Sequence, residues 1–181
     1  MQREYGAGQV AISSRNNPLI KAIRALAGRK ERERSETYFV DGLHLVAAAV
    51  QQGAPIERCV VALELLDSTF GRELLGEIVA RGVARLDVTA DVFASLAARE
   101  HAQGLGLVLR QRWHALDQLD AAAGRCWVAL DTVQYPGNLG AILRTCDAVG
   151  AAGAILLGNT ADPYDPAAVR ASVGAIFAQR L

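Results

Sequence analysis

The sequence lacks the features that mark several broad classes of protein. There are three cysteines, Cys59, Cys126 and Cys146, and no two of them form a CxxC pair, so neither a disulfide framework nor a zinc site is indicated. No apolar run approaches the roughly 20 residues that cross a bilayer, and the N-terminus has no apolar signal-peptide core. We therefore expect a cytoplasmic protein with no membrane partner and no metal, whose cysteines are all buried.

Nucleotide-binding signatures are missing too. No GxGxxG follows a predicted strand and no GxxxxGK[ST] occurs, which argues against a Rossmann-type nucleotide-binding enzyme. The net charge is zero, yet residues 1–40 carry eight Lys or Arg against four Glu. Such a basic segment indicates contact with phosphates. Its stretch GRKERERSE mixes both charges, however, at a spacing that also fits a solvent-exposed, salt-bridged helix.

Alternating helices and strands indicate an α/β fold. Hydrophobic periodicity, capping residues and Pro or Gly breaks place the elements, and their order favours a parallel or mixed sheet with helices on its faces. A charged, alanine-rich stretch, 113–125, predicts a linker between domains 1–112 and 126–181. The predicted helices are 17–27, 43–52, 68–82, 89–97 and 138–149, and the predicted strands are 38–41, 56–61, 84–88, 106–110, 126–131 and 153–157.

The most informative stretch is LDTVQYPGNLGAILRTCDAVGA, residues 130–151. A short apolar strand ends in Asp131, a Pro-Gly turn follows, and Asn138 stands where a helix N-cap is expected. The apolar side chains beyond it share one helical face, so Arg144 must face the turn or the solvent. Ligands of open α/β sheets bind beyond the carboxyl ends of the strands, which makes this segment the candidate site. From spacing alone, a plain helix cap and a solvated arginine explain it equally well.

This segment resembles the first conserved motif of the SpoU (TrmH-type) RNA ribose 2′-O-methyltransferases, a branch of the SPOUT superfamily. A second block, DPYDPAAVRASVGAIF at 162–177, resembles the region that follows in that family. The matching positions are Asn138, Gly140, Arg144, 147–150, Arg170, Ser172 and Gly174.

The N-terminal part resembles the substrate-binding domain of the same enzymes, which is similar to ribosomal protein L30e. The stretches ISSRNNPLIKAIRALAGRKERERSETYFVDGLHLV and HAQGLGLVL carry this resemblance. It implies an L30e-like α/β/α domain followed by the first part of a SPOUT (α/β knot) domain. The family's later glycine-asparagine-glutamate and serine-leucine-asparagine motifs do not occur. We therefore expect an absent knot, an incomplete S-adenosylmethionine pocket with no cofactor-binding residue in this chain, and an exposed apolar end at Ile176 and Phe177.

The resemblance implies S-adenosylmethionine-dependent methylation of a ribose 2′-hydroxyl in ribosomal or transfer RNA, without activity in this incomplete form. Arg144 would stabilise the developing alkoxide, because an arginine stays protonated and is no general base. Asn138 would orient Arg144 or the substrate. No metal is needed, the partner is structured RNA, and the full-length enzyme is expected to be a homodimer. The candidate RNA-binding residues are Arg15, Lys21, Arg29, Lys30, Arg32, His101, Gln103, Arg170 and Ser172.

One alternative stays open at this point. The chain could be an RNA-binding protein without catalytic activity, in which the second domain is a methyltransferase remnant, since the basic N-terminal segment fits both hypotheses. The two differ in whether the reading frame continues past Leu181 into the two missing motifs.

Overall fold

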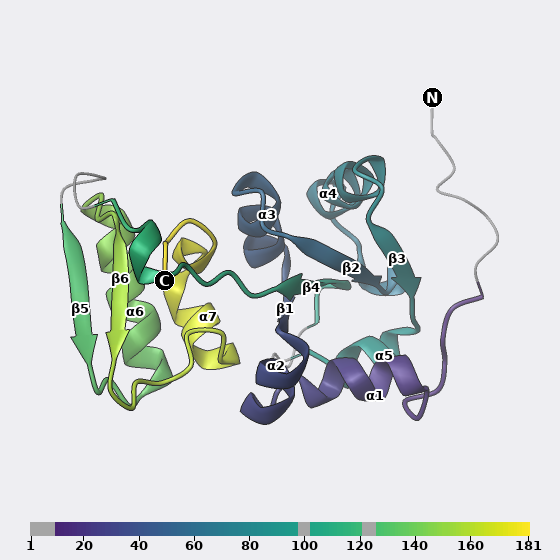
Figure 1. Ribbon diagram of the computed structural model, residues 1–181. Helices are drawn as coiled ribbons and strands as arrows, with labels where there is room; N and C mark the ends of the chain where they lie inside the picture. The colour runs from purple at the N-terminus through teal and green to yellow at the C-terminus, as the bar shows by residue number, and fades with distance from the viewer. Residues whose placement is uncertain (1–9, 98–101, 121–125) are drawn as a thin grey trace.

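The computed structural model describes residues 10–97, 102–120 and 126–181. Two sheets form the molecule, a four-stranded one of order β1-β4-β2-β3 and a two-stranded one of order β5-β6 (Figure 1). The α/β class predicted from the sequence is confirmed. Within the three described ranges no helix is long and apolar enough to cross a membrane, and no group of three His, Cys, Asp or Glu side chains is arranged to hold a metal ion.

The predicted strands all form, with ends within one residue of those expected. The strands are β1 (Thr37–Asp41), β2 (Ile56–Val61), β3 (Ala84–Asp87), β4 (Leu105–Arg110), β5 (Trp127–Asp131) and β6 (Gly153–Leu157). The helices are α1 (Pro18–Ala25), α2 (Arg29–Ser35), α3 (Leu43–Gln51), α4 (Thr69–Ala80), α5 (Ala90–Ala94), α6 (Pro136–Ala148) and α7 (Pro166–Ser172), with short 3₁₀ turns at Leu63–Leu65, Leu116–Gln118 and Ala175–Phe177. Helices α2 and α7 are additions to the predicted set.

The first sheet is covered by helices on both faces. Strand β4 is antiparallel to β1 and β2, whereas β2 and β3 are parallel, so the sheet is mixed. Successive side chains of a strand point to opposite faces, and Cys59 of β2 packs with α3 and α4 while Val60 packs with α1 and α5. The result is the α/β/α sandwich that the resemblance implies for this domain.

The second sheet is a single βαβ unit. Strands β5 and β6 are parallel and α6 connects them, as parallel neighbours require. Helix α7 packs closely on α6. A Cβ atom at Gly140 would overlap the carbonyl oxygen of Ala168 and lie 2.8 Å from Ala171 Cβ, so only glycine permits this approach of the two helices.

Two sequence-based expectations about burial are wrong. Ile176 and Phe177 are only 4% and 5% exposed, because the chain turns back at Gly174 (φ 99°) and the following 3₁₀ turn packs both side chains into the core. Cys126 is exposed, while Cys59 and Cys146 are buried as expected. Cys126 directly precedes β5, at the end of the second sheet.

A buried arginine joins the two parts of the molecule. Arg32 on α2 is 1% exposed, and its guanidinium donates to Asp162 Oδ2 at 2.7 Å and to Asp165 Oδ2 at 3.2 Å, just before α7. Aromatic rings meet beside it, with the centroids of Tyr38 and Tyr164 4.7 Å apart. The hydrophobic core accordingly runs without a break from the first sheet to the second.

Candidate functional site

The carboxyl ends of β5 and β6 are held tightly together. Thr132, just after β5, has φ 56°, a costly conformation for a β-branched residue. Its backbone N–H donates to Leu157 O at 3.2 Å and its Oγ1 donates to Asp131 Oδ1 at 2.8 Å. A Cβ atom at Gly158 would lie 2.8 Å from both of those side-chain oxygens. The exposed Asp131 carboxylate is therefore fixed, although no sequence signal pointed to Thr132 or Gly158.

Helix α6 begins two residues earlier than predicted. Its N-cap is Tyr135, which makes no side-chain capping bond, and Pro136 is the first helical residue. Proline suits that position because its missing N–H has no helical acceptor and its φ is already helical. Asn138 is thus the third residue of the helix, and its assignment as the N-cap is wrong. Its exposed side chain remains available for another molecule.

Arg144 projects from α6 into solvent, as predicted. The helix buries Leu139 and Leu143 on its inner face, and Arg144 shares the outer face with the exposed Gly137 and Ala141. The guanidinium of Arg144 makes no hydrogen bond or ion pair within the part of the chain that the structure describes. Small neighbours leave its five N–H donors accessible to a bound molecule.

The structure does not bring Asn138 and Arg144 into contact. They are six residues apart on one helix, which separates them by about 9 Å along its axis, and no hydrogen bond joins them. No contact in the structure supports the expected role of Asn138 in orienting Arg144.

Two of the candidate RNA contacts lie in the interior. The guanidinium of Arg32 donates hydrogen bonds to Asp162, to Asp165 and to the carbonyl oxygens of residues 26 and 27. Ser172 is 1% exposed, and its Oγ donates to Val169 O at 2.7 Å. The fold gives both side chains internal partners, so neither reaches RNA and both assignments are corrected. Sequence alone could not separate Arg32 from the exposed charges around it.

Four of the other basic candidates are exposed and lie on α1, on α2 or just before α1. Arg15 pairs with Asp91, and this ion pair holds the pKa of the Asp91 carboxyl below its usual value. Arg29 pairs with Glu33 at 2.7 Å. Salt-bridged charges on α2 agree with the alternative interpretation of GRKERERSE. The exposed side chains of this set are Arg15, Lys21, Arg29 and Lys30.

The three remaining candidates have different positions. Arg170 is exposed on α7. Gln103 precedes β4, and its Oε1 accepts from the backbone N–H of Leu43 at 3.0 Å, so it caps the start of α3. His101 lies outside the described residues.

Two known families match this chain, in the order that the two sheets follow. The MRM3-like substrate binding domain matches residues 17–106, and the SpoU rRNA Methylase family matches residues 125–181.

Among curated proteins, similar ones carry methyltransferase names. A 23S rRNA (uridine(2479)-2'-O)-methyltransferase of Streptomyces viridochromogenes is 30% identical over 167 residues, which are 92% of this chain and 57% of that protein. A 23S rRNA (guanosine(2553)-2'-O)-methyltransferase of Bacillus subtilis is 28% identical and covers 92% of this chain and 62% of its own length. The chain therefore spans less than two thirds of these relatives.

Solved structures agree with this similarity. The AdoMet-bound rRNA methyltransferase of Sinorhizobium meliloti superimposes with a TM-score of 0.82 at 36% identity, over 94% of this chain and 63% of that one. A SpoU methyltransferase of Streptomyces viridochromogenes in complex with AdoMet gives a TM-score of 0.79 at 29% identity, over 91% and 62%.

Proposed function

Because this chain belongs to the SpoU rRNA methylase family, we propose that it serves the transfer of a methyl group from S-adenosylmethionine to a ribose 2′-hydroxyl of RNA. One observation carries the proposal: Arg144 stands exposed on the helix that follows β5, without an ion pair to any described residue, inside the segment that matches the family. The relatives' names favour ribosomal RNA over transfer RNA as the substrate.

Methyl transfer to the ribose requires a group that stabilises negative charge on the 2′-oxygen. The guanidinium of Arg144 stays protonated and has five N–H donors, so it would bind the 2′-oxygen more strongly as charge develops on it. The Asn138 side chain can donate to or accept from the same substrate. Alignment of the two reacting groups would supply much of the remaining rate.

The expected incomplete S-adenosylmethionine pocket stays a prediction. At the end of β6 a cavity of about 240 Å³ lies between that strand's loop and α2, which is smaller than the roughly 300–1,000 Å³ usual for cofactor sites. No residue of this chain is therefore assigned to S-adenosylmethionine. The homodimer that the resemblance implies stays a prediction, and so does the cytoplasmic location.

Methyl transfer by the native gene product tests this proposal. Incorporation of labelled methyl groups into ribosomal RNA from cells that lack the gene would be measured for the wild type, for Arg144→Ala and for Arg180→Ala. Arg180 is an exposed arginine of the same domain and serves as the matched control. Loss of one transition-state hydrogen-bond donor should lower the rate about 10²–10³-fold in Arg144→Ala alone.

A different pattern would contradict the proposal. If the wild type binds ribosomal RNA yet methylates neither ribosomal nor transfer RNA, the RNA-binding alternative is favoured. Equal methylation by Arg144→Ala and wild type would remove Arg144 from the mechanism.

A further inference from the structure

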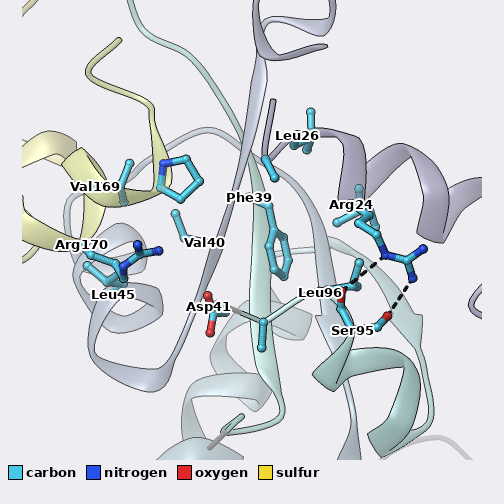
Figure 2. A pocket seen from close by; sticks show the side chains of 14 residues that line it. Arg24, Leu26, Phe39, Val40, Asp41, Leu45, Ser95, Leu96, Val169 and Arg170 are labelled. Carbon is cyan, nitrogen blue, oxygen red and sulfur yellow. Dashed lines mark hydrogen bonds between the residues drawn. The ribbon is translucent and has the colours of Figure 1, made fainter. Parts of the chain in front are cut away.

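A pocket opens where the two parts of the molecule meet. Its volume is about 370 Å³, and its walls come from α1, β1, the segment after α5, and α7 (Figure 2). Strand β1 is an edge strand, paired only with β4, and α7 lies along its free side. The apolar wall consists mainly of Ile23, Leu26, Phe39, Leu45 and Val169.

Two arginines stand on opposite sides of this pocket. Arg170 comes from α7 and Arg24 from α1, and Figure 2 shows Phe39 and Asp41 between them. Arg24 donates to Ser95 Oγ at 2.8 Å and to the carbonyl oxygens of Ser95 and Arg15 at 3.4 Å, which leaves two of its five N–H donors. The guanidinium of Arg170 makes no hydrogen bond or ion pair with another residue of the described ranges. An anionic group at the α7 side of the pocket would therefore meet the guanidinium of Arg170.

The same buried arginine that joins the two parts also fixes this pocket. Arg32 donates to Leu26 O at 2.9 Å and to Ala27 O at 2.8 Å, and both residues line the pocket on the α1 side. Its bonds to Asp165, the N-cap of α7, hold the opposite wall. The two walls are thus preorganised, which lowers the ordering cost of binding a ligand.

We propose that this pocket binds one unstacked nucleotide of the substrate RNA, with the base against Phe39 and the apolar wall and the phosphate on Arg170. Proteins that recognise RNA commonly splay single-stranded bases onto aromatic or apolar side chains. The volume lies at the small end of the range for ligand pockets, which suits a single nucleotide. The RNA part of this proposal rests on the proposed function.

A titration of the full chain tests the pocket. Backbone amide signals of the ¹⁵N-labelled protein would be followed while AMP, GMP, CMP, UMP or inorganic phosphate is added. We expect at least one nucleotide, but not phosphate alone, to shift the amides of Arg24, Phe39 and Arg170. Ala27→Trp should fill the pocket and abolish these shifts. Ala80→Trp is the matched control, an exposed alanine at the end of α4.

A variant without the charge of Arg170 distinguishes the contribution of the phosphate to binding from that of the base. Arg170→Gln should weaken nucleotide binding about threefold, the effect of one partly exposed ion pair, and leave the binding of the uncharged nucleoside unchanged. Arg81→Gln on α4, whose guanidinium pairs with Glu77 away from the pocket, should change neither. Shifts by phosphate equal to those by nucleotides, or no shift at the pocket with about 10 mM nucleotide, would overturn the proposal.

A binding measurement with RNA shows whether the nucleotide comes from an RNA chain. Affinity for a ribosomal RNA hairpin with an unpaired loop should fall at least threefold in Ala27→Trp relative to Ala80→Trp. Free nucleotide binding with unchanged hairpin affinity would instead assign the pocket to a free nucleotide and overturn the RNA part. Methylation that persists while the pocket takes no nucleotide would refute the pocket alone, whereas pocket binding without methylation would refute the proposed function alone.

Discussion

Individual side chains of one type meet different surroundings in this molecule, and the three thiols illustrate it. Burial raises the pKa of the Cys59 thiol from 9.0 to about 12 and also raises the pKa of Cys146, whereas Cys126 is exposed. Only the thiolate reacts with alkylating reagents. Burial therefore slows the alkylation of Cys59 and Cys146 twice, by blocking access and by raising the pKa of the thiol.

We expect iodoacetamide at pH 8 to modify Cys126 first and Cys59 only after unfolding, which peptide mass spectrometry would follow with time. The same pKa shift predicts a pH effect. Between pH 9 and about 12 the unfolded chain loses a proton that folded Cys59 keeps, so the free energy of unfolding should fall as pH rises through that range. If Cys59 were modified in the native protein as fast as Cys126, the Cys59 thiol would not be buried as described.

Gly158 is the residue on which the strand ends at the candidate site depend. Gly158→Ala combines strain at φ 59° with a Cβ atom against Asp131 and Thr132. Gly150→Ala, at φ 70° with nothing within 4 Å, isolates the backbone strain of roughly 1–2 kcal/mol. We expect Gly158→Ala to lower the free energy of unfolding by about 1–3 kcal/mol more than the control, measured by urea denaturation. Equal losses of unfolding free energy in the two variants would mean that the loop around Gly158 moves to accommodate the added Cβ atom without cost.

At the scale of elements, α6 and α7 depend on one close contact. Gly140→Ala places a Cβ atom on the Ala168 carbonyl oxygen and should cost about 1–3 kcal/mol through overpacking. Gly137→Ala in the same helix has nothing within 4 Å and should stabilise the protein by about 0.5–1 kcal/mol through helix propensity. Thermal unfolding of the two variants would therefore shift in opposite directions. A neutral or stabilising Gly140→Ala would show that the helices can separate without cost.

At the scale of the whole molecule, Arg32 sets the relation of the two parts. Arg32→Ala leaves Asp162, whose side chain is 9% exposed, without its cation. Breaking a buried ion pair in this way costs about 3–5 kcal/mol. Arg29→Ala, three residues earlier on α2, removes an exposed pair with Glu33 and should cost under about 1 kcal/mol.

Urea denaturation monitored by tryptophan fluorescence would measure both arginine variants. Since Arg32 also holds the wall of the pocket, Arg32→Ala should lose nucleotide binding as well, while Arg29→Ala keeps it. Similar stabilities for the two variants would contradict the role of Arg32 as the link between the parts.

Local patterns in the sequence were sufficient for most of the fold. The strand Ile56–Val61 has the predicted ends, α4 begins within one residue of the predicted start at Ser68, and Thr89 caps α5. Caps, breaks and apolar periodicity are properties of neighbouring residues, so they can be read without the fold. The start of α6 was missed because both Pro136 and Asn138 are good helix-start residues, and proline took the first helical position.

The sequence by itself determined the α/β class, the order of elements, the family and the outward direction of Arg144, since each follows from local spacing or motif. Only the tertiary structure decided the burial of Arg32 and Ser172, the exposure of Cys126, and the pocket between α1, β1 and α7. These depend on contacts between residues far apart in the chain: Arg32 meets Asp162, 130 positions away. A charged residue is buried only where the fold supplies its partners, and no local pattern records where those partners will be.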